Sequence, residues 1–213
     1  MAWFLSNLRY VAWTGLVLGA LFLIYFAMGV GSWGFDTQTF WEAALRWLHV
    51  LVGIMWIGHL YYFNFTQIPN APKIPEEHRG PSIGKVIAPA ALYWFRWGAM
   101  ATLITGLLLA WNQQYLLQAL TFGGVPFEGG IPFTDNKMWL IGVGMWLAII
   151  MWFNVWFIIW PNQQKALNIG DRYAGLDAPA KAAAAKTAML FSRTNTFLSV
   201  PMLVAMTGAS TLF

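Results

Sequence analysis

Two histidines, His49 and His59, lie in one apolar run that extends from Leu48 to Leu60. Burying an imidazole at membrane depth is costly, because each unsatisfied donor or acceptor in hydrocarbon costs several kcal/mol. A neutral imidazole is also a common axial ligand of haem iron and a common ligand of other metals. The segment therefore predicts a haem or metal site with either histidine as ligand. The alternative is a packed histidine near the membrane interface whose hydrogen bonds are satisfied.

The two histidines are ten residues apart on one expected helix. A rise of 1.5 Å per residue separates them by roughly 15 Å in depth, so they cannot bind one metal ion together. Met55 precedes His59 by four residues and therefore lies on the same face of this helix. His49, His59 and Met55 are accordingly three candidate ligands for a buried cofactor.

Arg96 and Asn154 are two further polar residues inside apolar runs. Arg96 is predicted either to bind an anionic group, such as a haem propionate, or to extend its guanidinium to the lipid headgroups. Asn154 is predicted either to contact a cofactor or to form a hydrogen bond between helices. Counted along their helices, both residues fall at a depth similar to that of His59. This placement predicts a polar cluster shared by at least three helices.

The composition identifies an integral membrane protein. Of 213 residues, 59% are hydrophobic and only 9% are charged, and the chain has 14 tryptophans. Such a balance is typical of a chain whose surface faces lipid. The absence of cysteine excludes disulfides, thiolate nucleophiles, cysteine-ligated iron–sulfur clusters and covalently attached c-type haem. A redox cofactor would have to be held by histidine, methionine or weaker ligands.

Apolar runs long enough to cross about 30 Å of hydrocarbon predict the fold. We expect a single all-α domain over residues 1–213, a polytopic membrane bundle of about five transmembrane helices. The five expected spans are 10–31, 43–66, 88–111, 138–160 and 193–212. The alanine-rich stretch Pro179–Leu190 is expected to form a helix that leads into the fifth span.

Basic residues are distributed unevenly between the two sides of this expected bundle. Nine of the twelve lysines and arginines precede the first span or lie in the loops 67–85 and 161–193. The opposite side carries only Arg46 and Lys137. Because basic loops stay in the cytoplasm, the pattern predicts a cytoplasmic N-terminus and a periplasmic C-terminus in a bacterial inner membrane.

Four segments, in order along the chain, resemble one known family. The first runs from Leu48-His49 through Trp56-Ile57-Gly58 to Tyr61-Tyr62-Phe63 and is similar to the second membrane helix of the urate oxidase N-terminal membrane family. This family forms the membrane part of the bacterial cytochrome c-type urate oxidase, or urate hydroxylase. The other matching segments are Trp94-Phe95-Arg96-Trp97 with Thr105-Gly106, Asn154-Val155 with Pro161-Asn162-Gln163, and Ser192, Asn195, Leu198 and Pro201.

The resemblance implies a membrane redox protein and, in the full-length family enzymes, urate oxidation linked to a C-terminal cytochrome c domain. Here the chain stops at Phe213 without a Cys-x-x-Cys-His motif, which suggests a short form that lacks this domain. Histidines of the family pattern fall on Tyr93 and Thr194, and His59 stands where the family usually has a small residue. The resemblance therefore implies the fold more directly than it implies urate chemistry.

Three functions remain open from the sequence. The first is an electron-transfer subunit that binds haem b through His49 or His59, with Arg96 near a propionate. The second is a non-catalytic accessory subunit of a larger respiratory or photosynthetic membrane complex. The third is purine oxidation, as in the resembling family. The expected partners are the lipid bilayer, other membrane subunits, and a quinone or a separate cytochrome c; nothing in the chain favours nucleic-acid binding.

Overall fold

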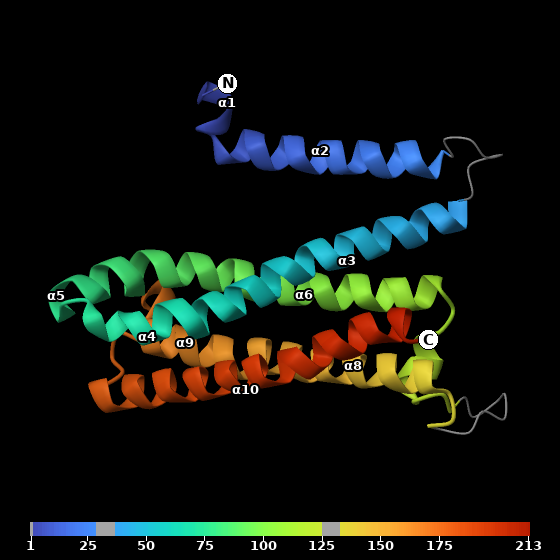
Figure 1. Cartoon of the computed structure of the whole chain (residues 1–213). Coiled ribbons are helices and arrows are strands. Elements are labelled where there is room, and N and C mark those ends of the chain that lie inside the picture. Colours follow the sequence, from blue (N-terminus) through green and yellow to red (C-terminus); the bar gives the residue numbers. More distant parts are fainter. Residues whose placement is uncertain (1, 29–36, 125–132) are drawn as a thin grey trace.

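The structure is a computed structural model that describes residues 2–28, 37–124 and 133–213. All regular elements in these residues are helices, so the predicted all-α membrane fold is confirmed. Four of the helices are long and apolar enough to cross a membrane (Figure 1). They cover Leu8–Phe26, Thr37–Lys73, Glu76–Asn112 and Asn136–Leu167.

Two continuous helical rods form an antiparallel hairpin that turns at Ile74 and Pro75 (Figure 1). The first rod consists of α3 (Thr37–Tyr61), the π-helix η1 (Tyr62–Gln67), α4 (Ile68–Asn70) and the 3₁₀ turn η2 (Ala71–Lys73). The second consists of α5 (Glu76–Arg79), the π-helix η3 (Gly80–Ile87) and α6 (Ala88–Asn112). Each rod has 37 residues, which corresponds to roughly 55 Å and exceeds the hydrocarbon thickness.

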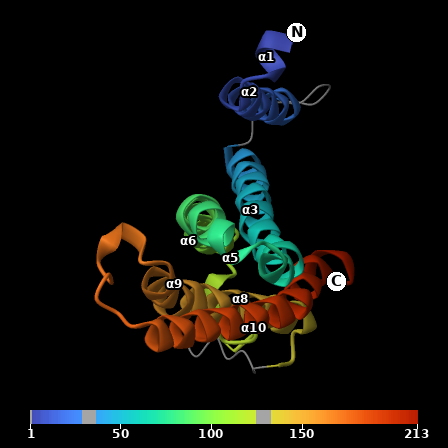
Figure 2. The ribbon, with the colours of Figure 1, turned by 90° about the vertical axis from the view of Figure 1, so that its left-hand side faces the viewer.

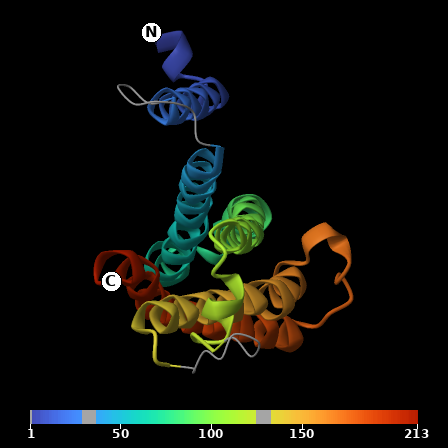
Figure 3. The ribbon, with the colours of Figure 1, turned by 90° about the vertical axis from the view of Figure 1, so that its right-hand side faces the viewer.

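A second pair of helices packs beside this hairpin (Figures 2 and 3). Its first rod is α8 (Asn136–Phe153), the π-helix η4 (Asn154–Ile159) and α9 (Trp160–Leu167). Its second rod is α10 (Ala178–Thr211), which the 3₁₀ turn η5 (Ile169–Asp171) precedes. The short helix α7 (Leu116–Leu120) connects α6 to this pair and packs on α8.

Three prolines explain the three π-helical segments. Proline has no N–H, and its ring clashes with the carbonyl four residues earlier in an α-helix. In each π segment the residue just before a proline donates its N–H to the carbonyl five residues back, so the helix continues through a wider turn. These donor and acceptor pairs are Ile68 and Phe63 before Pro69, Ala88 and Ile83 before Pro89, and Trp160 and Val155 before Pro161.

The expected fifth span, 193–212, lies within α10 except for its last residue, and α10 is not among the four helices of the described residues that are apolar enough to cross a membrane. Small and polar side chains lower its apolarity, and several of them are buried against neighbouring helices rather than exposed. They include Ser192, Asn195 and Ser199. The helix expected over 179–190 is present as the first part of α10, which continues through it without a break to Thr211.

Glycines and other small residues allow the rods to approach closely. A Cβ on Gly98 of α6 would lie 3.2 Å from the backbone nitrogen of Trp56 in α3. A Cβ on Gly144 of α8 would lie 3.2 Å from the Cβ of Ala205 in α10. Close backbone contact of this kind replaces the hydrophobic driving force that helices lack in lipid. The largest buried side chains between the rods are Trp56, Phe95, Leu60, Met151 and Ile159.

The two remaining helices lie at the N-terminus. The helix α2 (Leu8–Ala27) follows the short α1 (Ala2–Leu5) and lies apart from the four rods (Figure 2). None of its span is buried, and Trp47 of α3 lies against Gly19. Large apolar side chains such as Trp13, Phe22 and Phe26 are exposed along α2, as expected for a helix surrounded by lipid.

Candidate functional site

His49 is held by the α6 helix through a hydrogen bond that determines its tautomer. Its Nδ1 lies 3.1 Å from the hydroxyl oxygen of Thr105. That hydroxyl has one proton, which it donates to a backbone carbonyl of its own helix, 2.7 Å away at Ala101. With the hydroxyl proton in that bond, the hydroxyl oxygen accepts from His49, and this assigns the imidazole proton to Nδ1. The Nε2 atom is left with a free lone pair.

Gly106 gives this imidazole its space. A Cβ on Gly106 would lie 2.8 Å from Cε1 of His49 and 3.3 Å from Nδ1. Any other residue at this position would force the ring to move. Two neighbouring residues of α6, Thr105 and Gly106, thus fix the orientation and the position of one side chain of α3.

The site is close to a charged end of the bundle. Arg46, three residues before His49, forms an ion pair with Glu42 across 2.7 Å. Tyr115, which follows α6, is near both charges, and burial raises the pKa of its hydroxyl, so that it stays neutral at physiological pH. His49 therefore lies within one helical turn of charged groups, near the edge of the apolar region.

His59 is bonded within its own helix. Its Nδ1 lies 2.7 Å from the carbonyl oxygen of Met55, which can only accept a hydrogen bond. His59 therefore also carries its proton on Nδ1 and has a free lone pair on Nε2. The contact uses the backbone of Met55 rather than its sulfur, and the Met55 side chain is exposed.

Arg96 lies on a different face of α6 from the histidine contacts. Gly98 and Gly106 of α6 face α3, whereas the Arg96 guanidinium lies 3.7 Å above the ring of Trp160 at the start of α9. The Arg96 carbonyl accepts a hydrogen bond of 3.1 Å from the indole of Trp156. The structure therefore does not bring Arg96 together with His49 in one site.

Asn154 forms a hydrogen bond between helices, which is the second of the two roles that the sequence predicts for it. Its side-chain amide donates to the Asn195 carbonyl oxygen at 2.8 Å, and the Asn195 amide donates to the Met151 carbonyl at 2.9 Å. Both asparagines are buried. These bonds join α8 and η4 to α10, and neither of them involves His59 or Arg96.

A polar stripe on α10 extends this network to the other hairpin. Ser192 accepts a hydrogen bond of 2.8 Å from Asn64 of η1, and the Ser199 hydroxyl is 2.9 Å from that of Tyr61 in α3. Asn195 lies between the two serines on the same face of α10, since they are three and four residues away. This spacing of polar residues is the sequence signal that could have revealed the network.

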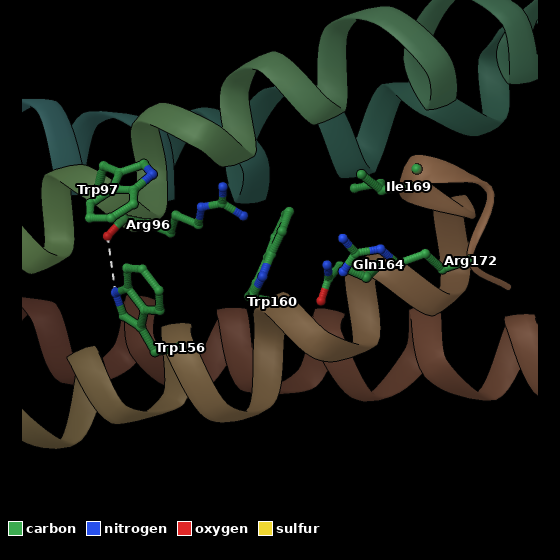
Figure 4. Close-up of a pocket in the computed structure, with 8 residues that line it drawn as sticks. Arg96, Trp97, Trp156, Trp160, Gln164, Ile169 and Arg172 are labelled. Carbon is green, nitrogen blue, oxygen red and sulfur yellow. Dashed lines mark hydrogen bonds between the residues drawn. The ribbon is translucent and has the colours of Figure 1, made fainter.

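A pocket of about 460 Å³ opens between α6 and the α8–α9 rod (Figure 4). Its walls combine two arginines, three tryptophans and a glutamine. The lining residues are Arg96, Trp97, Trp156, Trp160, Gln164, Ile169, Gly170 and Arg172. Of these the sequence identified only Arg96, because Arg172 reaches the pocket through the loop after α9, and no local pattern indicates where that loop folds.

The residues that the structure describes contain no group of three or more histidines and carboxylates able to hold a metal ion. A haem requires only one axial protein ligand, so this finding bears on multi-ligand metal sites and not on haem. Searches with this chain against models of protein families, against curated proteins and against solved structures found no match. Membership of the urate oxidase N-terminal membrane family and urate oxidation itself stay predictions.

Proposed function

We propose that this chain is a membrane subunit of a redox complex and that His49 is the axial ligand of a haem b. The observation that supports this role most directly is the hydrogen bond from His49 to Thr105, which leaves Nε2 free to bind iron. Ligand histidines commonly donate their other ring N–H to an acceptor, which fixes the ring and raises its basicity. Haem b would supply one-electron transfer when bound.

The arrangement suits a haem that is shared with another chain. Within the described residues the chain has two other histidines: His59, roughly 15 Å along the same helix, and His78, in the exposed helix α5. Neither lies opposite His49. A second protein ligand would therefore be a methionine of this chain or a residue of a neighbouring subunit. The electron partner of such a complex would be a quinone or a separate cytochrome c.

Alanine variants of the three histidines test the proposal. His49→Ala is expected to remove the Soret absorbance of the purified protein or to shift it, because alanine supplies no axial ligand. His78→Ala is the matched control and should retain the wild-type spectrum, since its side chain is 70% exposed. If His59→Ala removes the absorbance and His49→Ala does not, the ligand is His59. Wild-type haem content in both variants would contradict a histidine-bound haem.

A second function, that of a non-catalytic accessory subunit, is favoured by the polar network around α10. Asn154, Asn195 and Ser199 are buried, and their side chains bond one another or neighbouring helices, as expected of residues that stabilise a bundle. Affinity purification from native membranes distinguishes the two functions. An accessory subunit would copurify with partner subunits while containing no haem of its own.

The location that we propose is a bacterial inner membrane, with the basic loops in the cytoplasm. Reporter fusions at residue 175 and after Phe213 test this orientation. A cytoplasmic reporter at 175 and a periplasmic one at the C-terminus are expected, because the loop around 175 belongs to the basic side. The opposite pattern would show that the bundle is inverted. Two cytoplasmic reporters would show that α10 does not cross the membrane.

A further inference from the structure

We propose that the pocket between α6 and the α8–α9 rod binds an anionic phospholipid, with Arg96 and Arg172 as the cationic groups that attract its headgroup. This inference goes beyond the proposed haem site and does not rest on it, because Arg96 faces away from His49. It rests on the charge of the pocket, on the order of its lining residues and on its position at the end of an apolar helix.

The pocket has cationic groups and no anion to neutralise them. Of its lining residues two are arginines and none is acidic. The Nε atom of Arg96 is buried and has no hydrogen-bond partner in the described part of the chain. Asp171 precedes Arg172 but is not a lining residue, and its carboxylate accepts a bond from Asn168. A bound phosphate would supply the missing acceptor and countercharge.

The lining residues change from aromatic to polar along the pocket, as Figure 4 shows. Trp97 and Trp156 form one end, where their rings meet edge to face at 5.2 Å. Arg96 and Trp160 lie in the middle. Gln164 and the guanidinium of Arg172 form the other end, together with the aliphatic side chain of Ile169. This order matches an amphiphile, whose acyl chain would lie against the indoles while its headgroup meets the amide and the guanidiniums.

The pocket is also at the depth where headgroups lie. Trp160 ends the apolar run of this rod, because the residues that follow are Pro161-Asn162-Gln163-Gln164-Lys165. Tryptophans at the ends of spans are typical of the membrane–water interface. Trp97, at the aromatic end of the pocket, is 45% exposed, so a lipid chain can reach the pocket from the bilayer. Basic pockets between membrane helices bind anionic lipid headgroups elsewhere in this way.

Lipid binding measured by native mass spectrometry tests the proposal. The purified full chain in detergent would be titrated with phosphatidylglycerol and, separately, with phosphatidylcholine of the same acyl chains. We expect tighter binding of phosphatidylglycerol, and about a fivefold loss of its affinity in Arg172→Gln and in Arg96→Gln. Arg96→Lys should retain more affinity than Arg96→Gln, because it keeps the charge but not the planar guanidinium.

Lys137→Gln is the matched control, since Lys137 is a cation at the opposite end of the α8–α9 rod. It should leave the affinity unchanged. Arg172 is exposed, so Arg172→Gln decides the matter even if Arg96→Gln fails to fold. Equal affinities for the two lipids, or wild-type affinity in Arg172→Gln, would overturn the proposal. Full displacement of the lipid by an equal concentration of inorganic phosphate would instead identify a site for a soluble anion and would also overturn it.

Discussion

Replacing Gly142 by alanine is expected to lower the melting temperature of this protein by several degrees. The new Cβ would overlap the backbone carbonyl oxygen of Ala119 in α7 and would lie 3.0 Å from the ring of Phe122. Ala119 is fully buried, and α7 is further held to α8 by a hydrogen bond of 3.1 Å from Trp146 to the Leu120 carbonyl. A backbone group held in this way cannot rotate aside, so α7 would have to move.

Overpacking of this kind costs about 1–3 kcal/mol, which for a chain of this length corresponds to a fall of roughly 2–12 °C in the melting temperature. The measurement is a thermal melt in detergent followed by intrinsic tryptophan fluorescence. Gly58→Ala is the matched control, because Gly58 is also in a membrane helix and a Cβ there would meet no atom within 4 Å. Its melting temperature should stay the same or rise slightly, since alanine favours helix over glycine. Equal melting temperatures for the two variants would contradict the packing of α7 on α8.

Replacing Asn195 by leucine is expected to destabilise the bundle more than replacing Asn154 by leucine. Asn195 takes part in two hydrogen bonds between the rods, accepting from Asn154 and donating to the Met151 carbonyl. Its loss leaves the buried side-chain amide of Asn154 without an acceptor in a medium without water, and it removes one of the two donors to the Met151 carbonyl. Interhelical hydrogen bonds in membranes contribute about 0.6 kcal/mol on average and up to about 1.7 kcal/mol. We therefore expect a loss of about 1–2 kcal/mol for Asn195→Leu.

A double-mutant cycle isolates the bond between the two asparagines. The variant with both residues replaced should lose less stability than the sum of the single losses, because the second replacement breaks no further bond between them. Thr194→Val on α10 is the control, since Thr194 is exposed and bonds only to its own helix, at Leu190. Strict additivity of the two asparagine replacements would show that the bond between α8 and α10 contributes nothing.

The helical fold follows from the sequence because runs of apolar residues longer than about 18 must span or pack as helices. The lengths of the helices follow less well. Pro69 and Pro161 lie just beyond the expected spans 43–66 and 138–160, yet π turns accommodate them and the rods continue. Proline ends a helix more often than a helix continues past it through a wider turn, so the sequence alone favours an end at these positions. The fifth expected span is less apolar than the other four, because α10 carries polar side chains such as Asn195 and Ser199 that are buried against neighbouring helices.

The candidate site was predictable in its residues but not in their grouping. Residue type and depth identified His49, Arg96 and Asn154. Their partners depend on which face each helix turns to its neighbours. Gly98, Thr102 and Gly106 recur every fourth residue and mark a contact face of α6, but they do not show which helix packs on it. As a result Arg96 meets Trp160 rather than a histidine, and Asn154 meets Asn195.

The haem content of the wild-type protein tests the proposed function most directly. The full chain would be purified from membranes of cells that make haem, and haem b would be measured as its pyridine complex relative to protein. A haem bound by His49 predicts one haem b per chain, or one per two chains if two copies share it. The His49→Ala variant should contain close to none. Wild-type protein without haem b, purified together with its native partner subunits, would contradict the proposal.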